Sequence, residues 1–189
     1  MKFKGLKGIL MLFFVSMCFL GFFFRMNNKK TPEPEAPAKI SAVDTVLQRN
    51  LNSNYPSTPK EVVKYFSEIT KCYYNEEFED DADIEALARQ MLLLYDDELV
   101  SYKNFSDYMF DLKSDIRFYN ENGYKIGSYA TSASTDVFYF QEDGFEWARL
   151  YCIFTIKSGK EKKDVTEVFV LRKDDKSHWK IYGWKEDNG

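Results

Sequence analysis

The sequence predicts an α+β domain, and three observations support this fold class. Apolar residues recur at helical spacing from Thr58 to about Asn120. After Gly123 they recur at every second position, which is the period of a strand. Short polar turns separate these later runs, as they do in antiparallel hairpins. Helices followed by hairpins are typical of helices packed on one face of a sheet. We expect about three helices and about four strands.

The chain begins with a segment that predicts a membrane span. Residues Gly8–Phe24 carry no charge, and a helix of this length would measure roughly 26 Å, close to the thickness of a hydrocarbon core. No small-residue cleavage site follows, so we expect an uncleaved anchor rather than a secretory signal. A lipoprotein signal at Cys18 is disfavoured because Met17 precedes it and apolar residues follow. A buried core helix is disfavoured because the segment has no polar face.

The orientation of this span depends on the charges beside it. They are nearly balanced: Lys2, Lys4 and Lys7 in the basic tail 1–7, and Arg25, Lys29 and Lys30 after the span. The positive-inside rule therefore barely decides. A short basic tail before the apolar run is typical of a signal-anchor. The protein would then cross the cell membrane once, with its C-terminal domain outside the cytoplasm.

Residues 25–57 are expected to form a linker. Prolines alternate with glutamates from Pro32 to Pro37, a composition that favours an extended, semi-stiff spacer. Further on, Ser41 and Asp44 could cap a short helix whose apolar side chains would be Val43, Leu47 and Leu51.

The domain itself is placed at residues 58–186. Thr58 to Glu61 form a capping-box pattern with Pro59 at the first helical position. The three expected helices run from there to about Asn75, then over Ala82–Tyr95 and Phe105–Asn120, and Gly123 should end the last one. The expected strands are Tyr124–Phe140, bent at Gly127 and at ATSAST (130–135), then Phe145–Lys157, Val165–Arg172 and His178–Lys185.

Charge and cysteine content limit the classes of function. The net charge of −4 hides an acidic domain, because residues 1–30 hold six of the 26 basic side chains and none of the 30 acidic ones. The remainder has a net charge of −10, which argues against nucleic-acid binding. Cys72 and Cys152 could pair if the domain is exported, or could be buried free thiols.

The helix–strand order, with YPSTPKEVV at 55–63, FVLRK at 169–173 and WKIYGW at 179–184, resembles the nuclear transport factor 2-like (cystatin-like α+β roll) superfamily over about residues 58–186. More narrowly, residues 55–63, 94–99 and 169–184 are similar to uncharacterised single-span membrane-anchored proteins of Gram-positive clostridial bacteria. The resemblance implies a cone-shaped roll with a curved sheet and a cavity between helices and sheet. It implies no single function, because the superfamily includes isomerases, hydrolases, transport factors and secretion-channel subunits.

No constellation in the sequence predicts catalysis, a metal or a cofactor. The acidic run Glu76–Glu85 lacks the glycine and the closing ligand of a calcium loop, so we expect a solvated turn. The single histidine, His178, is part of no nucleophile or metal motif. Asp111 and Asp115 lie off the apolar stripe of their helix, and no strand is expected to carry an acid on its apolar face.

Aromatic side chains are the remaining candidates for binding. Trp147 and Tyr151 are expected on the outer face of the sheet, and Tyr182 and Trp184 on a common face of the last strand, where exposed aromatic patches mark interfaces. If the cavity is open, Phe66, Tyr73 and Tyr108 should line it.

These observations predict a membrane-anchored extracytoplasmic binding or scaffolding module. A homodimer or a protein partner could form through the outer sheet face. One alternative is a subunit of a secretion or conjugation channel. The other is a cavity-based enzyme or small-ligand binder, which a cavity filled by side chains would exclude and a deep pocket with a desolvated carboxylate would favour.

Overall fold

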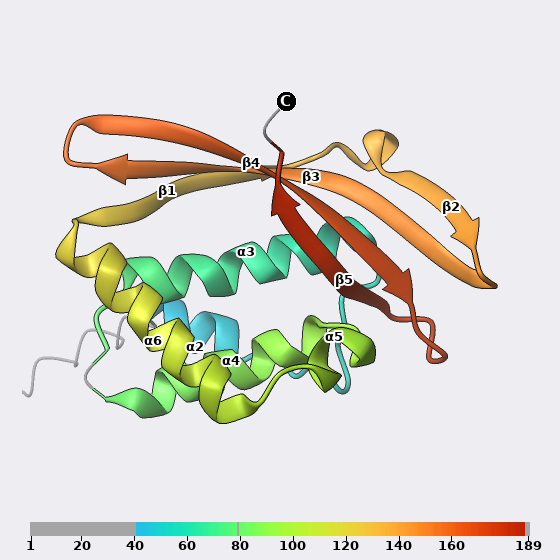
Figure 1. Ribbon diagram of the computed structural model, residues 1–189, viewed down its shortest axis with the longest axis horizontal. Coiled ribbons are helices and arrows are strands. Elements are labelled where there is room, and N and C mark those ends of the chain that lie inside the picture. The colour runs from blue at the N-terminus through green and yellow to red at the C-terminus, as the bar shows by residue number, and fades with distance from the viewer. Residues whose placement is uncertain (1–40, 79, 188–189) are drawn as a thin grey trace, which may run out of the picture. The chain divides into compact units, whose positions relative to one another are not determined.

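The domain consists of helices packed on one face of an antiparallel sheet. The computed structural model describes residues 41–78 and 80–187, which belong to one unit, Ile40–Gly189. Figure 1 shows the helices gathered on one side of the sheet, with the other face uncovered by helices. The predicted α+β class is confirmed.

The predicted basic tail, the apolar segment at 8–24 and the proline-rich part of the linker lie outside the described residues. Within residues 41–78 and 80–187, no helix has the length and apolar character needed to cross a membrane.

The described residues form five α-helices rather than the expected three: α2 (Ala42–Leu47), α3 (Pro59–Asn75), α4 (Asp81–Leu94), α5 (Asp97–Ser101) and α6 (Phe105–Glu121). The three long ones match the predicted ranges closely. The start of α3 is capped as predicted, with Thr58 accepting a hydrogen bond from the Glu61 amide at 3.2 Å. The Glu61 carboxylate, however, accepts from Ser57 rather than from the capping residue.

Helix α2 is part of the hydrophobic core. Its capping box is complete, because Ser41 and Asp44 each accept a hydrogen bond from the other's amide. Val43 and Val46 are buried, while Leu47, expected on the apolar side, is only half-buried. The core therefore extends before residue 58, into the range that the sequence suggested was linker.

The sheet has five strands, one more than expected: β1 (Tyr124–Thr131), β2 (Phe138–Glu142), β3 (Phe145–Ser158), β4 (Glu161–Lys173) and β5 (Trp179–Glu186). Strands β1 and β2 pair with successive parts of the same edge of β3. They correspond to the single bent strand predicted from the sequence, interrupted by a 3₁₀ turn at Ser134–Asp136, where the ATSAST stretch ends. A bulge at Gly127 provides the other predicted bend.

A second bulge, in β5, corrects one expectation about the aromatic residues. Leu171 pairs with Ile181 but Val170 pairs with Gly183, so β5 holds one extra residue there. The extra residue reverses the alternation of side chains. Tyr182 packs with Trp147 on the outer face, whereas Trp184 packs with Phe66 and Phe169 on the inner face. The prediction that Tyr182 and Trp184 share one face is wrong.

The core lies between the inner face of the sheet and the helices. Ala148, Leu150 and Cys152 alternate along β3 as fully buried side chains. They pack in one cluster with the buried side of α3, which includes Val62 and Ile69. Cys72 and Cys152 are both buried and free, so the alternative of a disulfide does not apply.

Candidate functional site

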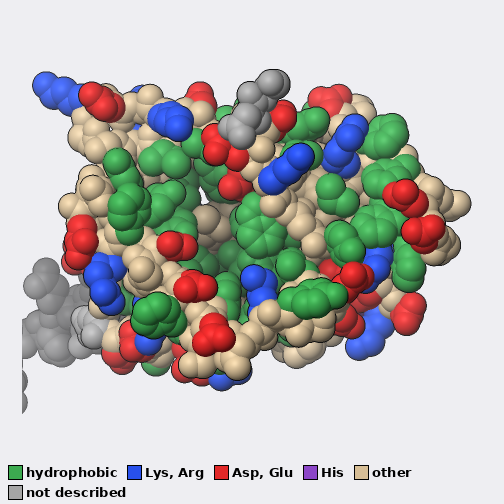
Figure 2. Space-filling model, viewed as in Figure 1, with side chains coloured by type: hydrophobic (Ala, Val, Ile, Leu, Met, Phe, Trp, Pro, Cys, Tyr) green, Lys and Arg blue, Asp and Glu red, His purple; other side chains and the backbone are tan. Residues whose placement is uncertain are grey.

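A cavity of about 420 Å³ lies between the helices and the inner face of the sheet. The space-filling view shows a hollow between the two layers, bordered by hydrophobic and acidic side chains (Figure 2). The aromatic residues of its lining come from both layers: Phe66, Tyr73, Tyr74, Tyr95, Tyr108, Tyr119, Phe154 and Trp184. Phe66, Tyr73 and Tyr108 thus lie where the sequence placed them for an open cavity, and the volume is ordinary for a small-molecule site.

Tyrosine hydroxyls give this cavity hydrogen-bonding capacity. Tyr73 is 2% exposed, and its hydroxyl has no hydrogen-bond partner among the described residues. Burial, with the neighbouring Tyr108 hydroxyl, raises the pKa of both Tyr73 and Tyr95 above the ordinary tyrosine value. Both phenols are therefore protonated at neutral pH, and the Tyr73 hydroxyl is a buried polar atom behind the cavity lining, unpaired within the described part of the chain.

Glu167 is a carboxylate on the apolar inner face of β4. It alternates with Val165 and Phe169, and its register partners are Cys152 on β3 and Glu186 on β5. No described residue forms an ion pair with it. Burial, reinforced by the charge of Glu186, raises the pKa of Glu167 to about 7.

Two further carboxylates, Asp111 and Asp115, line the cavity from α6. Both are exposed, as their positions off the apolar stripe predicted, so they stand at the mouth. Partial burial and the charge of Asp111 raise the pKa of Asp115. One cationic side chain, Lys103, also lines the cavity. Its ammonium lies 5.5 Å from the ring centroid of Tyr108 and 6.0 Å from that of Tyr95, within the range of a cation–π contact.

The lining is consequently acidic. Three carboxyl groups face one ammonium group, and the described residues supply no ion pair to any of the three carboxylates. A second hollow, beside α2, is larger at about 550 Å³, but its Arg49 and Lys71 balance its Glu68 and Glu76. The cavity at Glu167 thus combines many aromatic rings with an excess of negative charge that the hollow beside α2 lacks.

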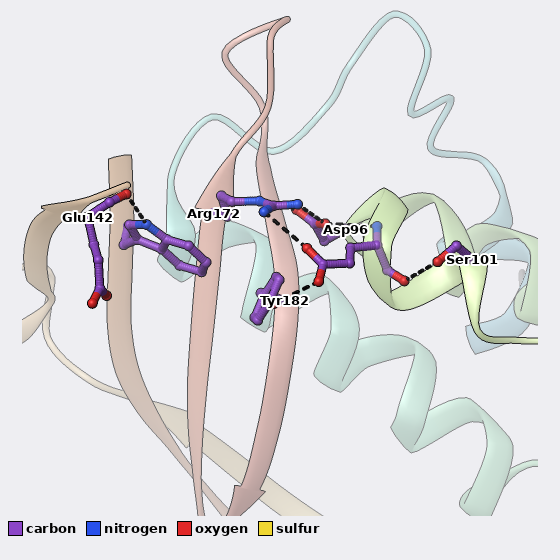
Figure 3. A network of polar contacts seen from close by, with 7 residues as sticks. Asp96, Ser101, Glu142, Arg172 and Tyr182 are labelled. Atoms are coloured by element: carbon purple, nitrogen blue, oxygen red, sulfur yellow. Dashed lines mark hydrogen bonds and ion pairs between the residues drawn. The ribbon is translucent and has the colours of Figure 1, made fainter. Parts of the chain in front are cut away.

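The outer face of the sheet carries a separate aromatic cluster. Trp147 and Tyr151 lie there as predicted, and Tyr182 joins them. The ring of Trp147 is 5.0 Å from that of Tyr182 and stacks with Phe140 at 6.1 Å. Its indole N–H donates to the carbonyl of Glu142 at 3.0 Å (Figure 3).

Arg172 occupies the centre of this outer cluster. Its guanidinium lies 4.7 to 5.6 Å from the ring centroids of Phe145, Tyr182 and Trp147. It also donates to Asp96 at 2.9 Å and to Glu98 at 3.3 Å. Figure 3 shows Arg172 reaching from β4 toward Asp96 at the start of α5, with Tyr182 beside it. Here the chain supplies its own cation to the rings and carboxylates.

Metal ligands are not grouped in the described ranges, where no three His, Cys, Asp or Glu side chains could hold an ion together. The acidic run before α4 has local roles instead. Asp80 caps that helix by accepting from the Ala82 amide, and Asp81 pairs with Lys113 at 2.6 Å.

The comparison with known families covers nearly the whole chain. A family model described as "Domain of unknown function (DUF6715)" matches residues 1–184. The chain belongs to this family. The matched range spans the apolar segment as well as the folded domain. A search of curated proteins finds no match.

For this member of the DUF6715 family, sequence reasoning missed Glu167. The expectation that no strand carries an acid on its apolar face is wrong. The signal was present, because Val165, Glu167, Phe169 and Leu171 form one alternating row and Phe169 and Leu171 are fully buried. An acid in such a row must face the core side.

Proposed function

We propose that this protein is a membrane-anchored module whose C-terminal domain, outside the cytoplasm, binds a small molecule in the cavity at Glu167. The observation that carries the proposal is the cavity itself, which encloses a carboxylate and a phenol that have no described partner. This cavity is the candidate site of the binding module expected from the sequence. The alternative of a small-ligand binder is favoured over pure scaffolding.

Energetics support a binding role for these groups. A buried polar group without a hydrogen bond costs stability, on the order of 1–3 kcal/mol. The Tyr73 hydroxyl is buried and has no described partner, and Glu167 is desolvated without a counter-ion among the described residues. Desolvated titratable groups that face a cavity are a common mark of a functional site.

The apolar segment Gly8–Phe24 supports the anchoring part of the proposal. The helices on one face of the sheet and the cavity between the two layers support an assignment to the nuclear transport factor 2-like roll. A carboxyl group with a pKa near neutrality is also compatible with proton transfer, so the enzymatic alternative would place Glu167 as the acid–base group.

A second candidate function, self-association, uses the outer sheet face. Phe138, Phe145, Tyr151 and Ile153 lie on that face and are 40% to 55% exposed. Light scattering of the full chain should give a dimer mass if two copies pack these side chains together, and Ile153→Glu should return the mass to that of a monomer. The channel-subunit alternative predicts larger oligomers in the same measurement.

Ligand-dependent thermal unfolding tests the proposed site. The purified full chain, in a non-ionic maltoside detergent, would be screened against cationic, neutral and anionic molecules that fit about 420 Å³. Any ligand that binds only the folded state raises the unfolding midpoint. Thr70 lines the cavity, so Thr70→Trp should fill it and abolish the rise. Tyr151→Ala, on the outer face, should leave the rise unchanged.

A rise that persists in Thr70→Trp, or no rise with any of the three classes in the unmodified protein, would contradict the proposal.

A further inference from the structure

We infer that the ligand of this cavity is an organic cation, a small molecule whose ammonium group lies against the tyrosine rings and pairs with Glu167. This inference rests on the proposed function and adds the chemical class of the ligand. It follows from charge, from the kind of ring that lines the site, and from a comparison within the same sheet.

The charge of the lining favours a cation. Glu167, Asp111 and Asp115 contribute three carboxyl groups, and Lys103 contributes the opposing charge. An anionic ligand would meet like charge in a partly desolvated site, which is unfavourable. A neutral apolar ligand would leave Glu167 without a partner, which is the costly arrangement for a partly buried charged group.

The rings favour a cation as well. The cavity is lined by tyrosines from α3, from α6 and from the position after α4, together with Trp184 from β5. The electron-rich faces of such rings attract ammonium groups. Lys103 already demonstrates this, because its ammonium lies over the rings of Tyr108 and Tyr95.

On the outer face of the sheet, a similar set of aromatic rings and carboxylates already surrounds a cation. There, three aromatic rings and two carboxylates surround the guanidinium of Arg172. The inner cluster has the same two ingredients, rings and carboxylates. Among the described residues, however, no cationic side chain reaches Glu167. A ligand ammonium would supply to Glu167 what Arg172 supplies to Asp96.

Ionisation of Glu167 should control the affinity. The groups that face it are Glu186 on β5 and Cys152 on β3. Its charge also acts on Tyr74 of α3, on Tyr95 after α4 and on Tyr119 of α6. Burial raises the pKa of Cys152 and of the three tyrosines, so all four stay neutral at pH 7. Glu167 is therefore the group whose charge changes near neutrality, and cation binding should strengthen from pH 6 to pH 8.

Calorimetric titration with matched pairs of probes tests the inference. The full chain, in a maltoside detergent, is titrated with choline and with 3,3-dimethylbutan-1-ol, which has the same shape but no charge. A second pair is n-hexylammonium and n-hexanol. We expect at least one cation to bind tenfold or more tightly than its uncharged counterpart. Glu167→Gln should remove that difference, and Glu161→Gln, an exposed site on the same strand, should preserve it.

The outcomes separate the two levels of the proposal. If the neutral probes bind as tightly as the cations and Thr70→Trp abolishes both, the cavity is a binding site but the inference of a cationic ligand is overturned. If neither charged nor neutral probes bind, the proposed function fails together with the inference. Tyr108→Leu, which removes a ring and keeps every carboxylate, provides a second variant and should weaken the cations more than the neutral probes.

Discussion

Both faces of the sheet carry aromatic rings and carboxylates, but in the described part of the chain only the carboxylates of the outer cluster are paired with a cation of the chain. On the outer face, the rings of Phe145, Trp147 and Tyr182 surround Arg172, which pairs with Asp96 and Glu98. On the inner face, tyrosine rings surround a cavity, and Glu167 has no counter-ion among the described residues. A complete cluster stabilises the fold, whereas an incomplete one costs stability, and we propose that a ligand completes the inner one.

The comparison predicts opposite effects when each cluster is altered. The largest effect is expected on the outer face. Arg172→Ala should leave Asp96, whose side chain is 4% exposed, as an unpaired buried charge. Loss of one partner of a buried pair typically costs about 3–5 kcal/mol, and urea denaturation should show a loss of this size. Lys113→Ala breaks an exposed ion pair with Asp81 and should cost under about 1 kcal/mol. Equal losses in the two variants would contradict the assignment of Arg172 as a structural cation.

On the inner face, Glu167→Gln should stabilise the protein, and only above acidic pH. The pKa of Glu167 is raised from 4.5 to about 7 by folding. The folded state therefore binds more protons between these values, and stability falls as the pH rises through that window. The glutamine variant lacks this loss, so its free energy of unfolding at pH 8 should be higher. Because the Glu167 side chain is partly exposed, the expected gain is on the order of 1 kcal/mol. At pH 4 the two proteins should unfold alike, and a variant that is less stable at pH 8 would show that Glu167 has a structural partner.

Two buried tyrosine hydroxyls differ in the same way, because one has a hydrogen-bond partner and the other has none among the described residues. The Tyr65 hydroxyl donates to the carbonyl of Val46 at 2.8 Å, whereas the Tyr73 hydroxyl has no described partner. Tyr65→Phe should therefore lose about 0.5–1.5 kcal/mol, and Tyr73→Phe should lose nothing or gain slightly. Denaturation midpoints of the two variants, measured side by side, check this difference. A larger loss for Tyr73→Phe would mean that its hydroxyl is already satisfied.

The smallest expected effect on stability comes from the apolar segment. Deletion of residues 8–24 should leave the unfolding of the domain unchanged, because the described core begins at Val43. The same deletion should move the protein from the membrane fraction to the supernatant. A variant that stays in the membrane fraction would contradict the proposed anchor.

The regular elements were predictable because their signals are local. The cap at Thr58, the short polar turn before Phe145 and the alternation along β3 depend on residues close in sequence, and each is present in the structure. Residues Asp143 and Gly144 both have positive φ angles, as a tight hairpin requires. The candidates Phe66, Tyr73 and Tyr108 followed from helical spacing for the same reason.

The features that escaped prediction depend on contacts between distant residues. The bulge in β5 arises from pairing with β4, and it moved Trp184 to the inner face. The partner of Arg172 lies 76 residues away, so no local pattern could identify the outer cluster as self-paired. Glu167 could have been recognised from its alternating row, but its lack of a partner is a property of the folded layers.

The pKa of Glu167 is the most direct measure of the difference between the two faces. Carbon-13 NMR of the side-chain carboxyl, titrated with and without saturating choline, would report it for the intact protein. The account predicts a pKa of about 7 for Glu167 in the free protein and a clear fall when the cation binds, because an adjacent positive charge favours the ionised form. A pKa in the ordinary glutamate range before choline is added, or one that choline at saturation leaves unchanged, would contradict the account.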